Sequence, residues 1–182
     1  MKILGRREGG RVNADELRRM QAPLKERYRA EPGAAIVKMR AVGQVMMDRV
    51  ACRVETPRGP VDGGLHRAAG GDGTLACSGD MLLEALVACA GVTLSAVATA
   101  TGIALDSARV EAEGEIDFRG TLGVAKDAPV GFKQISLRFT LKTNAPPERI
   151  VRLIQTTERY CVVLQTLRQS PSVHVDTLVE AV

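Results

Sequence analysis

The spacing of hydrophobic residues changes along this chain, and each change predicts a different element. Two runs rich in β-branched and apolar residues, 35–40 and 49–54, precede the turn-forming segment 56–60 and predict a β-hairpin. Residues 62–79 contain six glycines and predict a loop. The first half of the chain therefore begins with paired strands and continues into irregular structure.

Residues 80–101 predict a long helix that is buried on almost every side. Apolar side chains recur there without leaving a polar face, which is typical of a helix at the centre of a domain. Ser78 or Asp80 is suited to cap the N-terminus of this helix, and Gly102 is suited to end it.

Two long strands are predicted next. Apolar and polar residues alternate over 109–118 and again over 132–142, so each strand has one apolar face and one wet face. We expect the two strands to form an antiparallel pair.

A second long helix follows, with Asn144 as its cap and two prolines in its first turn. Residues at steps of three and four lie on its core side: Ile150, Leu153, Ile154, Thr157, Cys161 and Leu164. Pro171 ends the helical region, and residues 173–176 begin a last strand. The predicted fold class is α+β, with two long helices against antiparallel sheet.

Residues 1–33 are rich in arginine and are predicted to form an N-terminal extension to a domain at 34–182. Asn13 is suited to cap a short helix that runs to Met20, and Pro23 is suited to open a second one that ends before Pro32.

Composition restricts the class of function. The 25 basic residues are interleaved with 21 acidic ones, and the chain has no tryptophan, two tyrosines and three phenylalanines, which argues against a nucleic-acid binder. No run reaches the roughly 18 to 20 consecutive apolar residues of a membrane helix, and the N-terminus lacks the apolar core of a signal peptide. We therefore expect a cytoplasmic protein without a membrane partner.

The four cysteines point to thiol chemistry. Cys52, Cys77, Cys89 and Cys161 include no C-x-x-C pair, and with only two histidines a zinc site is not expected. The glycines fit no phosphate-binding motif, so no cofactor is expected. A cysteine with a special role here is a redox or nucleophilic thiol.

Two segments carry a resemblance to a known family. A glycine-rich loop at 70–73 leads into the run Ser78-Gly79-Asp80-Met81-Leu82-Leu83-Glu84-Ala85-Leu86-Val87-Ala88-Cys89, and a later helix holds Glu158-Arg159-Tyr160-Cys161-Val162-Val163. In this order and spacing, over residues 34–182, the chain resembles the OsmC/Ohr family of organic hydroperoxide resistance proteins.

The resemblance implies an intertwined homodimer, with antiparallel sheets around two long central helices, that reduces organic hydroperoxides. It implies that Cys89 attacks the peroxide, that Cys161 resolves the product, and that an external dithiol restores both thiols. It also implies an arginine held by an acid beside the attacking thiol, because burial alone raises the pKa of a thiol. Asp80 takes the place of that acid, and Arg40 is our choice for the arginine.

Some assignments remain open. Arg49 and Arg53 are rivals of Arg40, and Glu158, one helical turn before Cys161, is an alternative acid. The chain departs from the family at three positions: Val162 and Ser78 stand in place of prolines, and Asp80 in place of a glutamate.

Three further interpretations compete with this assignment. Cys77, in the predicted loop, could compete for disulfide formation. A protein of the same fold could instead bind a small apolar or electrophilic ligand at the dimer interface without reducing peroxides. The arginine-rich extension could serve interaction with other proteins.

Overall fold

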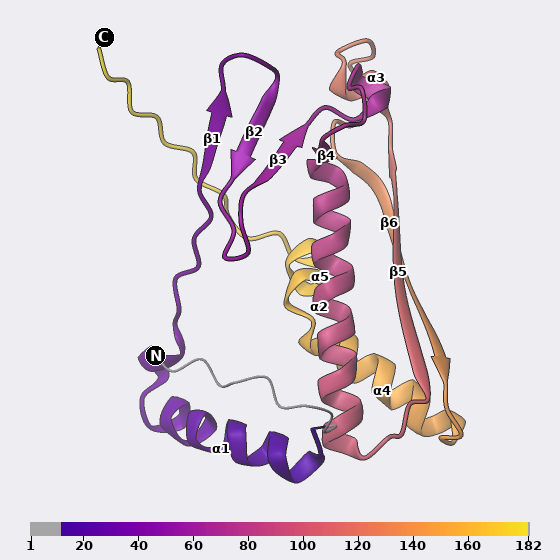
Figure 1. The fold of residues 1–182 in the computed structure, drawn as a ribbon. Coiled ribbons are helices and arrows are strands. Elements are labelled where there is room, and N and C mark those ends of the chain that lie inside the picture. The colour runs from indigo at the N-terminus through magenta and orange to yellow at the C-terminus, as the bar shows by residue number, and fades with distance from the viewer. Residues whose placement is uncertain (1–11, 182) are drawn as a thin grey trace.

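The computed structural model describes residues 12–181. A long helix, α2 (Ser78–Thr101), runs through the middle of the molecule, and a pair of long strands stands beside it (Figure 1). The other elements, in chain order, are α1 (Ala14–Ala30), η1 (Pro32–Ala35), β1 (Gly43–Met46), β2 (Ala51–Val54), β3 (Val61–Gly64), η2 (Arg67–Ala69), β4 (Ala76–Cys77), β5 (Ser107–Ile116), α3 (Phe118–Thr121), β6 (Phe132–Lys142), α4 (Pro147–Tyr160) and α5 (Val162–Arg168).

The strands form two separate sheets. One has the order β1-β2-β3-β4, antiparallel except for the parallel pair β3 and β4, and the other is the antiparallel pair β5 and β6. The mixture of antiparallel sheet and helices confirms the predicted α+β class.

The β5–β6 pair presents one face to α2. Side chains along both strands alternate between half-buried and exposed, as the sequence predicted. Gly114 is required on the covered face, because a Cβ atom at this position would collide with the ring of Phe132 on β6. The ring of Phe132 also lies next to the first turn of α2, at Gly79.

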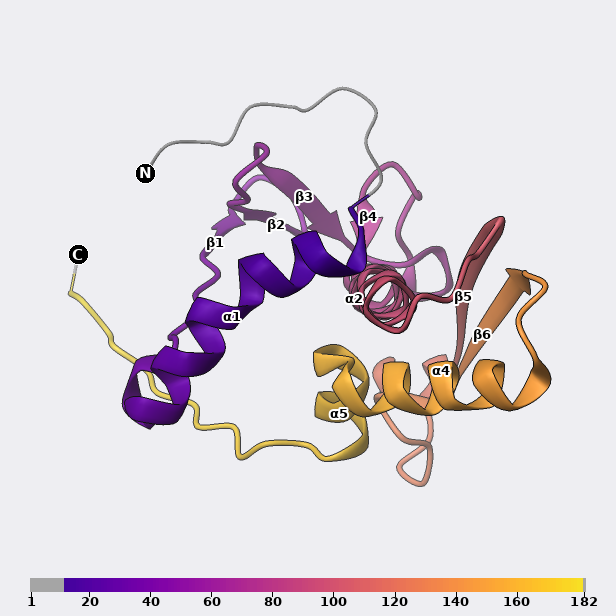
Figure 2. The same cartoon turned by 90° about the horizontal axis from the view of Figure 1, so that it is seen from below.

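Two apolar clusters hold α2 to its neighbours. One joins Leu94 and Ala98 of α2 to Ile103 and to Leu153 of α4. The other joins Leu86 and Ala90 of α2 to Cys161, which lies between α4 and α5. Figure 2 looks along α2 and shows β5–β6 on one side of it, α4 and α5 on another, and α1 meeting it at one end.

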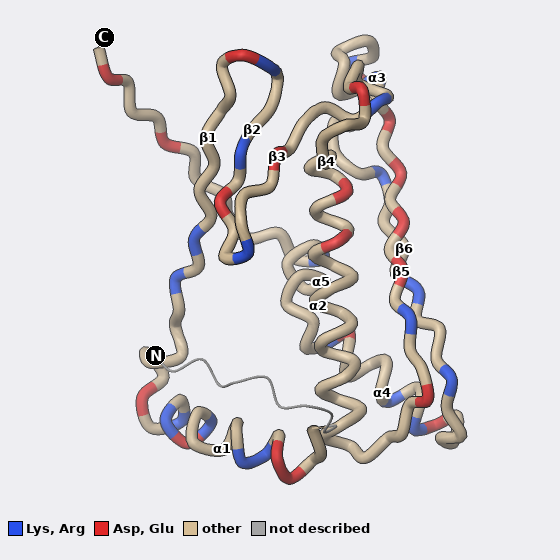
Figure 3. The backbone as a smooth tube through the Cα atoms, in the orientation of Figure 1, with Lys and Arg blue, Asp and Glu red and all other residues tan. Residues whose placement is uncertain are grey.

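Much of α2 is nevertheless uncovered. Its charged residues lie near its N-terminal end (Figure 3), and Val92 at mid-helix is 71% exposed. By length and composition α2 could span a membrane. The mean hydropathy of its apolar stretch is 2.0, and 22% of that stretch is buried. The search of the sequence for a long run of consecutive apolar residues did not select α2, because glycine, serine and threonine interrupt its apolar residues. Among the described residues this is the one helix of that kind.

The first predicted strand was wrong. Residues 36–40 are extended but unpaired, and Ile36 and Met39 are 80% and 95% exposed. The tight turn at 47–50 sets the register instead, so that Met46 faces Ala51 and residues 43–46 pair with 51–54. The predicted loop at 62–79 instead holds most of β3, including Gly63 and Gly64, and all of β4.

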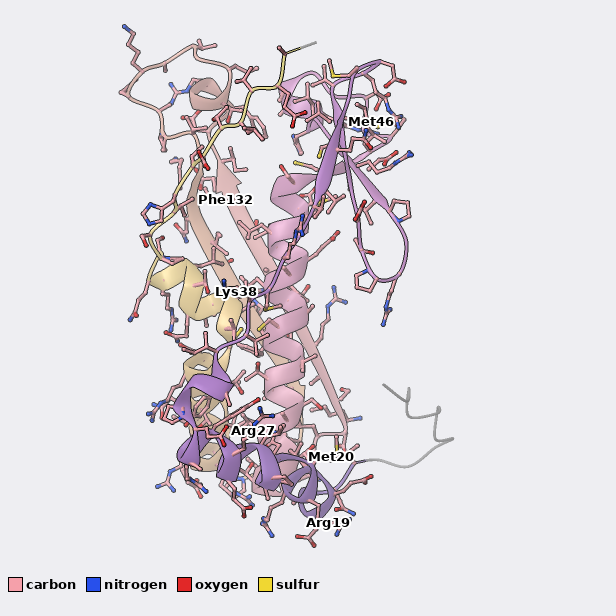
Figure 4. The ribbon with its side chains drawn as sticks, turned by 90° about the vertical axis from the view of Figure 1, so that its left-hand side faces the viewer. Arg19, Met20, Arg27, Lys38, Met46 and Phe132 are labelled. Atoms are coloured by element: carbon pink, nitrogen blue, oxygen red, sulfur yellow. The ribbon has the colours of Figure 1, made fainter. Side chains whose placement is uncertain are left out.

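Other boundaries differ at the two ends of the chain. A single helix, α1, replaces the two predicted short ones: Asn13 caps it as expected, and Pro23 lies inside it. A proline removes one backbone donor, but strong helix formers follow it here. Figure 4 labels Arg19, Met20 and Arg27 on this exposed helix. The predicted strand at 173–176 is extended and exposed, and it pairs with no strand of residues 12–181.

Candidate active site

Cys89 and Cys161 lie in one apolar cluster. Cys89 is half-buried on α2 and packs against the cluster formed by Leu86, Ala90 and Cys161. Cys161 is completely buried. Both cysteines are free thiols. The structure therefore brings together the two cysteines that the sequence analysis selected.

Cys161 sits at a break in what was predicted to be one helix. Its backbone is extended, with φ −75° and ψ 104°, so that α4 ends before it and α5 begins after it. The N–H of Cys161 still reaches the carbonyl of Thr157 at 3.0 Å, and the N–H of Gln165 reaches the carbonyl of Cys161 at 2.9 Å. The N–H groups of residues 162–164 lie between these bonds, at the start of α5, where a helix offers no acceptor of its own.

The environment lowers the pKa of the Cys89 thiol below its usual range. Burial is the largest single influence and acts in the opposite direction. The N–H of Val163, the thiol of Cys161 and the N–H of Val162 together outweigh it. Donors directed at the sulfur stabilise the thiolate, which is the reactive form.

The pKa of Cys161 is raised. Burial is the main cause, and the neighbouring Cys89 adds to it through hydrogen bonding and like charge, while the N–H of Leu164 opposes it. These opposite directions favour ionisation of Cys89 before Cys161.

Asp80 and Arg40 lie elsewhere in the single chain. Asp80 is exposed in the first turn of α2, nine residues before Cys89 and therefore about 13 Å away along the helix axis. Arg40 is exposed on the segment before β1, which Figures 1 and 2 show apart from α2. The rivals Arg49 and Arg53 both pair with Asp62 of β3.

A pocket of about 670 Å³ adjoins the cysteine cluster, between α2, β6, α4 and α5. Leu86 and Leu164 belong both to its wall and to the cluster that holds the two cysteines. Its charged lining residues are Lys133, Glu158 and Arg168, and the last two form an ion pair of 2.9 Å. The pocket can take an apolar molecule with a polar end.

The sequence analysis named Glu158 as an alternative acid but did not identify three features of the site: Arg168, Thr93 and the N–H groups at the start of α5. Arg168 is ten residues from Glu158, a separation without a helical signature. Thr93 lies one turn after Cys89 on the same helix, a spacing that could have revealed it, and its hydroxyl donates to the backbone carbonyl of Cys89 at 2.8 Å. The backbone donors of α5 depend on a break that the periodicity concealed.

No metal site accompanies the cysteines. Within residues 12–181, histidine, cysteine, aspartate and glutamate form no group of three or more that could hold a metal ion.

The fold and the cysteine pair define a class: an α+β protein whose central helix places one thiol against a second thiol at the break of a neighbouring helix. The chain belongs to the OsmC-like protein family, whose sequence pattern matches residues 71–176, more than half of the chain. No curated protein has a significantly similar sequence.

Solved structures share the fold at low sequence identity. The OsmC-like protein from Mycoplasma pneumoniae is 16% identical, with a TM-score of 0.61 over 74% of this chain and 89% of its own. An organic hydroperoxide resistance protein OsmC from Legionella pneumophila is 18% identical, with a TM-score of 0.57 over 74% and 93%. An organic hydroperoxide resistance protein from Elizabethkingia anophelis is 15% identical, with a TM-score of 0.58 over 75% and 91%.

Proposed function

We propose that this chain is a thiol-dependent peroxidase that reduces organic hydroperoxides through Cys89 and Cys161. The observation that carries the proposal is the packing of Cys89 of α2 against the buried thiol of Cys161 in one apolar cluster. A peroxidase of this kind needs one thiolate that attacks the peroxide and a second thiol that then forms the disulfide. Membership of the OsmC-like family and the names of two structural relatives support the same activity.

The proposed reaction has three steps. The Cys89 thiolate attacks one peroxide oxygen, an S–O bond forms as the O–O bond breaks, and the alkoxide takes a proton and leaves as the alcohol. The Cys161 sulfur then attacks the sulfenic acid, an S–S bond forms, and the hydroxyl group leaves with a proton as water. An external dithiol supplies two electrons and two protons to restore both thiols.

The electrostatics of the pair favour this sequence of steps. The charge of the Cys89 thiolate is one of the influences that raise the pKa of Cys161. Conversion of Cys89 to a neutral sulfenic acid removes that charge, so Cys161 ionises more readily when its attack is required.

A second subunit is part of the proposal. The exposed face of α2 contains small and apolar residues, and Val92 at its centre is 71% exposed. We propose that a second copy covers this face and that Arg40 and Asp80 act at the site in that homodimer.

The test is turnover of cumene hydroperoxide with dithiothreitol as reductant. Cys89→Ser should abolish turnover, whereas Cys161→Ser should leave one round of oxidation and block the formation of the internal disulfide. The double variant Cys52→Ser/Cys77→Ser is the matched control and should retain turnover, because both side chains lie outside the cluster. Turnover retained by Cys89→Ser would contradict the proposal.

A second candidate function, binding of an apolar ligand without peroxide reduction, is favoured by the 670 Å³ pocket. The same experiment separates the two functions. Wild-type protein that binds an apolar fluorescent probe in this pocket but consumes no hydroperoxide would support the binding protein.

A further inference from the structure

We propose that the side-chain amide of Gln165 is a positioning group for the resolving thiol. It holds the break between α4 and α5 in place, and this break sets where the thiol of Cys161 lies against α2. The inference deepens the proposed function, on which it rests, because it names what places Cys161 for the second step of the reaction.

The first observation is a backbone carbonyl that the break deprives of its helical partner. In a continuous helix the carbonyl of Glu158 would accept from the N–H of Val162, four residues later. The extended backbone of Cys161, with ψ 104°, interrupts the helix between these two groups. The amide of Gln165 takes the vacant place, and its Nε2 donates to the Glu158 carbonyl at 2.7 Å in a half-buried position. Because a covered acceptor without a donor costs stability, the break depends on this bond.

Gln165 is joined to both sides of the break. Its backbone N–H donates to the carbonyl of Cys161 at 2.9 Å, and its side chain reaches back to α4. The ion pair of Glu158 and Arg168, at 2.9 Å, makes a second link between the two helices. The side chain of Arg168 is 54% exposed, and ion pairs at exposed positions contribute little. Gln165 is therefore the stronger of the two links.

The break decides which surface α5 meets. α5 packs against α2, and three of its side chains belong to the apolar cluster of the two cysteines: Val163, Leu164 and Leu167. A helix that continued through residue 161 would carry α5 onward along the axis of α4 instead. The Cys161 thiol, which is completely buried, would then lose the neighbours that hold it beside Cys89.

The second step can be followed without a hydroperoxide. The Cys89 thiolate attacks oxidised glutathione, a mixed disulfide forms on Cys89, and a glutathione thiolate leaves. The Cys161 thiol then loses its proton and attacks the Cys89 sulfur, the internal disulfide forms, and the second glutathione leaves as a thiolate that takes up a proton. Acid quenching and mass spectrometry of the Cys52→Ser/Cys77→Ser protein separate the glutathione adduct from the internal disulfide.

Gln165→Met keeps the length of the side chain and removes the donor. Conversion of the adduct to the internal disulfide should slow about fivefold, which is the order of effect of one hydrogen bond, while the adduct forms at its wild-type rate. Gln155→Met, on the exposed side of α4, is the matched control and should behave as the wild type. Equal conversion rates in Gln165→Met and the wild type would overturn the inference.

A proline at position 162 should restore the second step. The side chain of Val162 is 69% exposed, and proline is accepted at the first position of a helix, where it requires an extended residue before it. Val162→Pro therefore fixes the break without Gln165, and conversion in Val162→Pro/Gln165→Met should return to the wild-type rate. A general loss of stability would not be repaired in this way. Conversion that stays slow in the double variant would also overturn the inference, since Gln165 would then act by another route than the break.

A measurement on the wild type covers the case in which Gln165→Met does not fold. In nitrogen–proton correlation spectra, the side-chain amide protons of Gln165 should exchange with solvent at least about fivefold more slowly than those of the exposed Gln155. Equal exchange would contradict the proposed role.

Turnover of hydroperoxide is measured separately, so that the two proposals can fail independently. Slowed conversion in Gln165→Met, with no consumption of hydroperoxide by the wild type, removes the peroxidase and leaves the positioning role. Wild-type turnover with unchanged conversion in Gln165→Met removes the positioning role alone.

Discussion

Arg53 and Asp62 face each other across β2 and β3, with Nε and Nη2 of the arginine donating to Oδ1 and Oδ2 of the carboxylate at 2.8 and 2.9 Å. Arg49 adds a third bond to the same carboxylate at 2.9 Å. The bond from Arg53 is the main reason why the pKa of Asp62 is lowered. Asp62 therefore occupies both rivals of Arg40, and the sequence analysis did not identify it as an acid that holds an arginine.

Arg40 is accordingly the arginine to test in the assembled protein. If a second subunit brings it to the site, Arg40→Met should raise the pKa of Cys89 by about one unit, because an opposite charge favours the thiolate. Arg53→Met is the control and should leave this pKa unchanged, because Arg53 pairs with Asp62. Thiolate absorbance against pH in the Cys52→Ser/Cys77→Ser background is the measurement. An unchanged titration in Arg40→Met would leave the backbone donors as the activating groups.

The two thiols of the proposed active site should be alkylated over different pH ranges. Because the pKa of Cys89 is lowered and that of Cys161 is raised, Cys89 should react first as pH rises from 6, and Cys161 only at pH above the usual range of a thiol. A short exposure to iodoacetamide at several pH values, followed by mass spectrometry, gives both profiles. Equal labelling at pH 7 would contradict the assigned roles.

Val92→Glu should dissociate the proposed homodimer. It places a charge at the centre of the exposed face of α2, where a second copy would have to bury it. Val124→Glu is the matched control, because Val124 is 74% exposed on the loop after α3. Light scattering at micromolar concentration should report a monomer for the first variant and a dimer for the second and for the wild type. A wild-type monomer would remove the dimer from the proposal.

The ionised carboxylate of Asp117 should contribute to the free energy of unfolding, and this contribution should be lost at low pH. It accepts from the backbone and side chain of Arg119, and these bonds lower its pKa to about 2. A depressed pKa contributes stability above the unfolded value near 3.8, and that contribution is lost as pH falls toward 2. Asp117→Asn should therefore be less stable than the wild type at pH 7, with a difference that narrows below pH 4. Urea unfolding at pH 7, 4 and 2 would show this. A difference independent of pH would mean that the carboxylate charge has no part in it.

The elements that the sequence predicted well are those whose pattern fits only one kind of secondary structure. Apolar and polar residues alternate from Ile135 to Lys142, and β6 has the predicted bounds 132–142. The predominantly apolar segment 80–101 is too long for a strand and indicates a long helix, and Gly102 ends it in a left-handed conformation. The meeting of Cys89 and Cys161 followed from the resemblance, not from periodicity.

The predictions that were wrong have a common physical origin. A local sequence pattern does not determine which other segment of the chain it packs against. Residues 36–40 have strand-like composition, but a strand needs a neighbour, and the turn at 47–50 gives that place to 43–46. The steps of three and four through Cys161 and Leu164 continue across the break, so the spacing hid the interruption that exposes the donors of α5. Backbone N–H groups have no side-chain signature, and a search by residue type passes over them.

The uncovered surface of α2 also affects how the protein is made. α2 precedes β5, β6, α4 and α5 in the chain, so its apolar side chains leave the ribosome before the elements that cover any of them. Until those elements are synthesised, the apolar surface of α2 is exposed, and such transiently exposed surface is what chaperones protect from aggregation. In the proposed homodimer, a subunit without its second copy would keep the apolar face of α2 around Val92 exposed to other proteins.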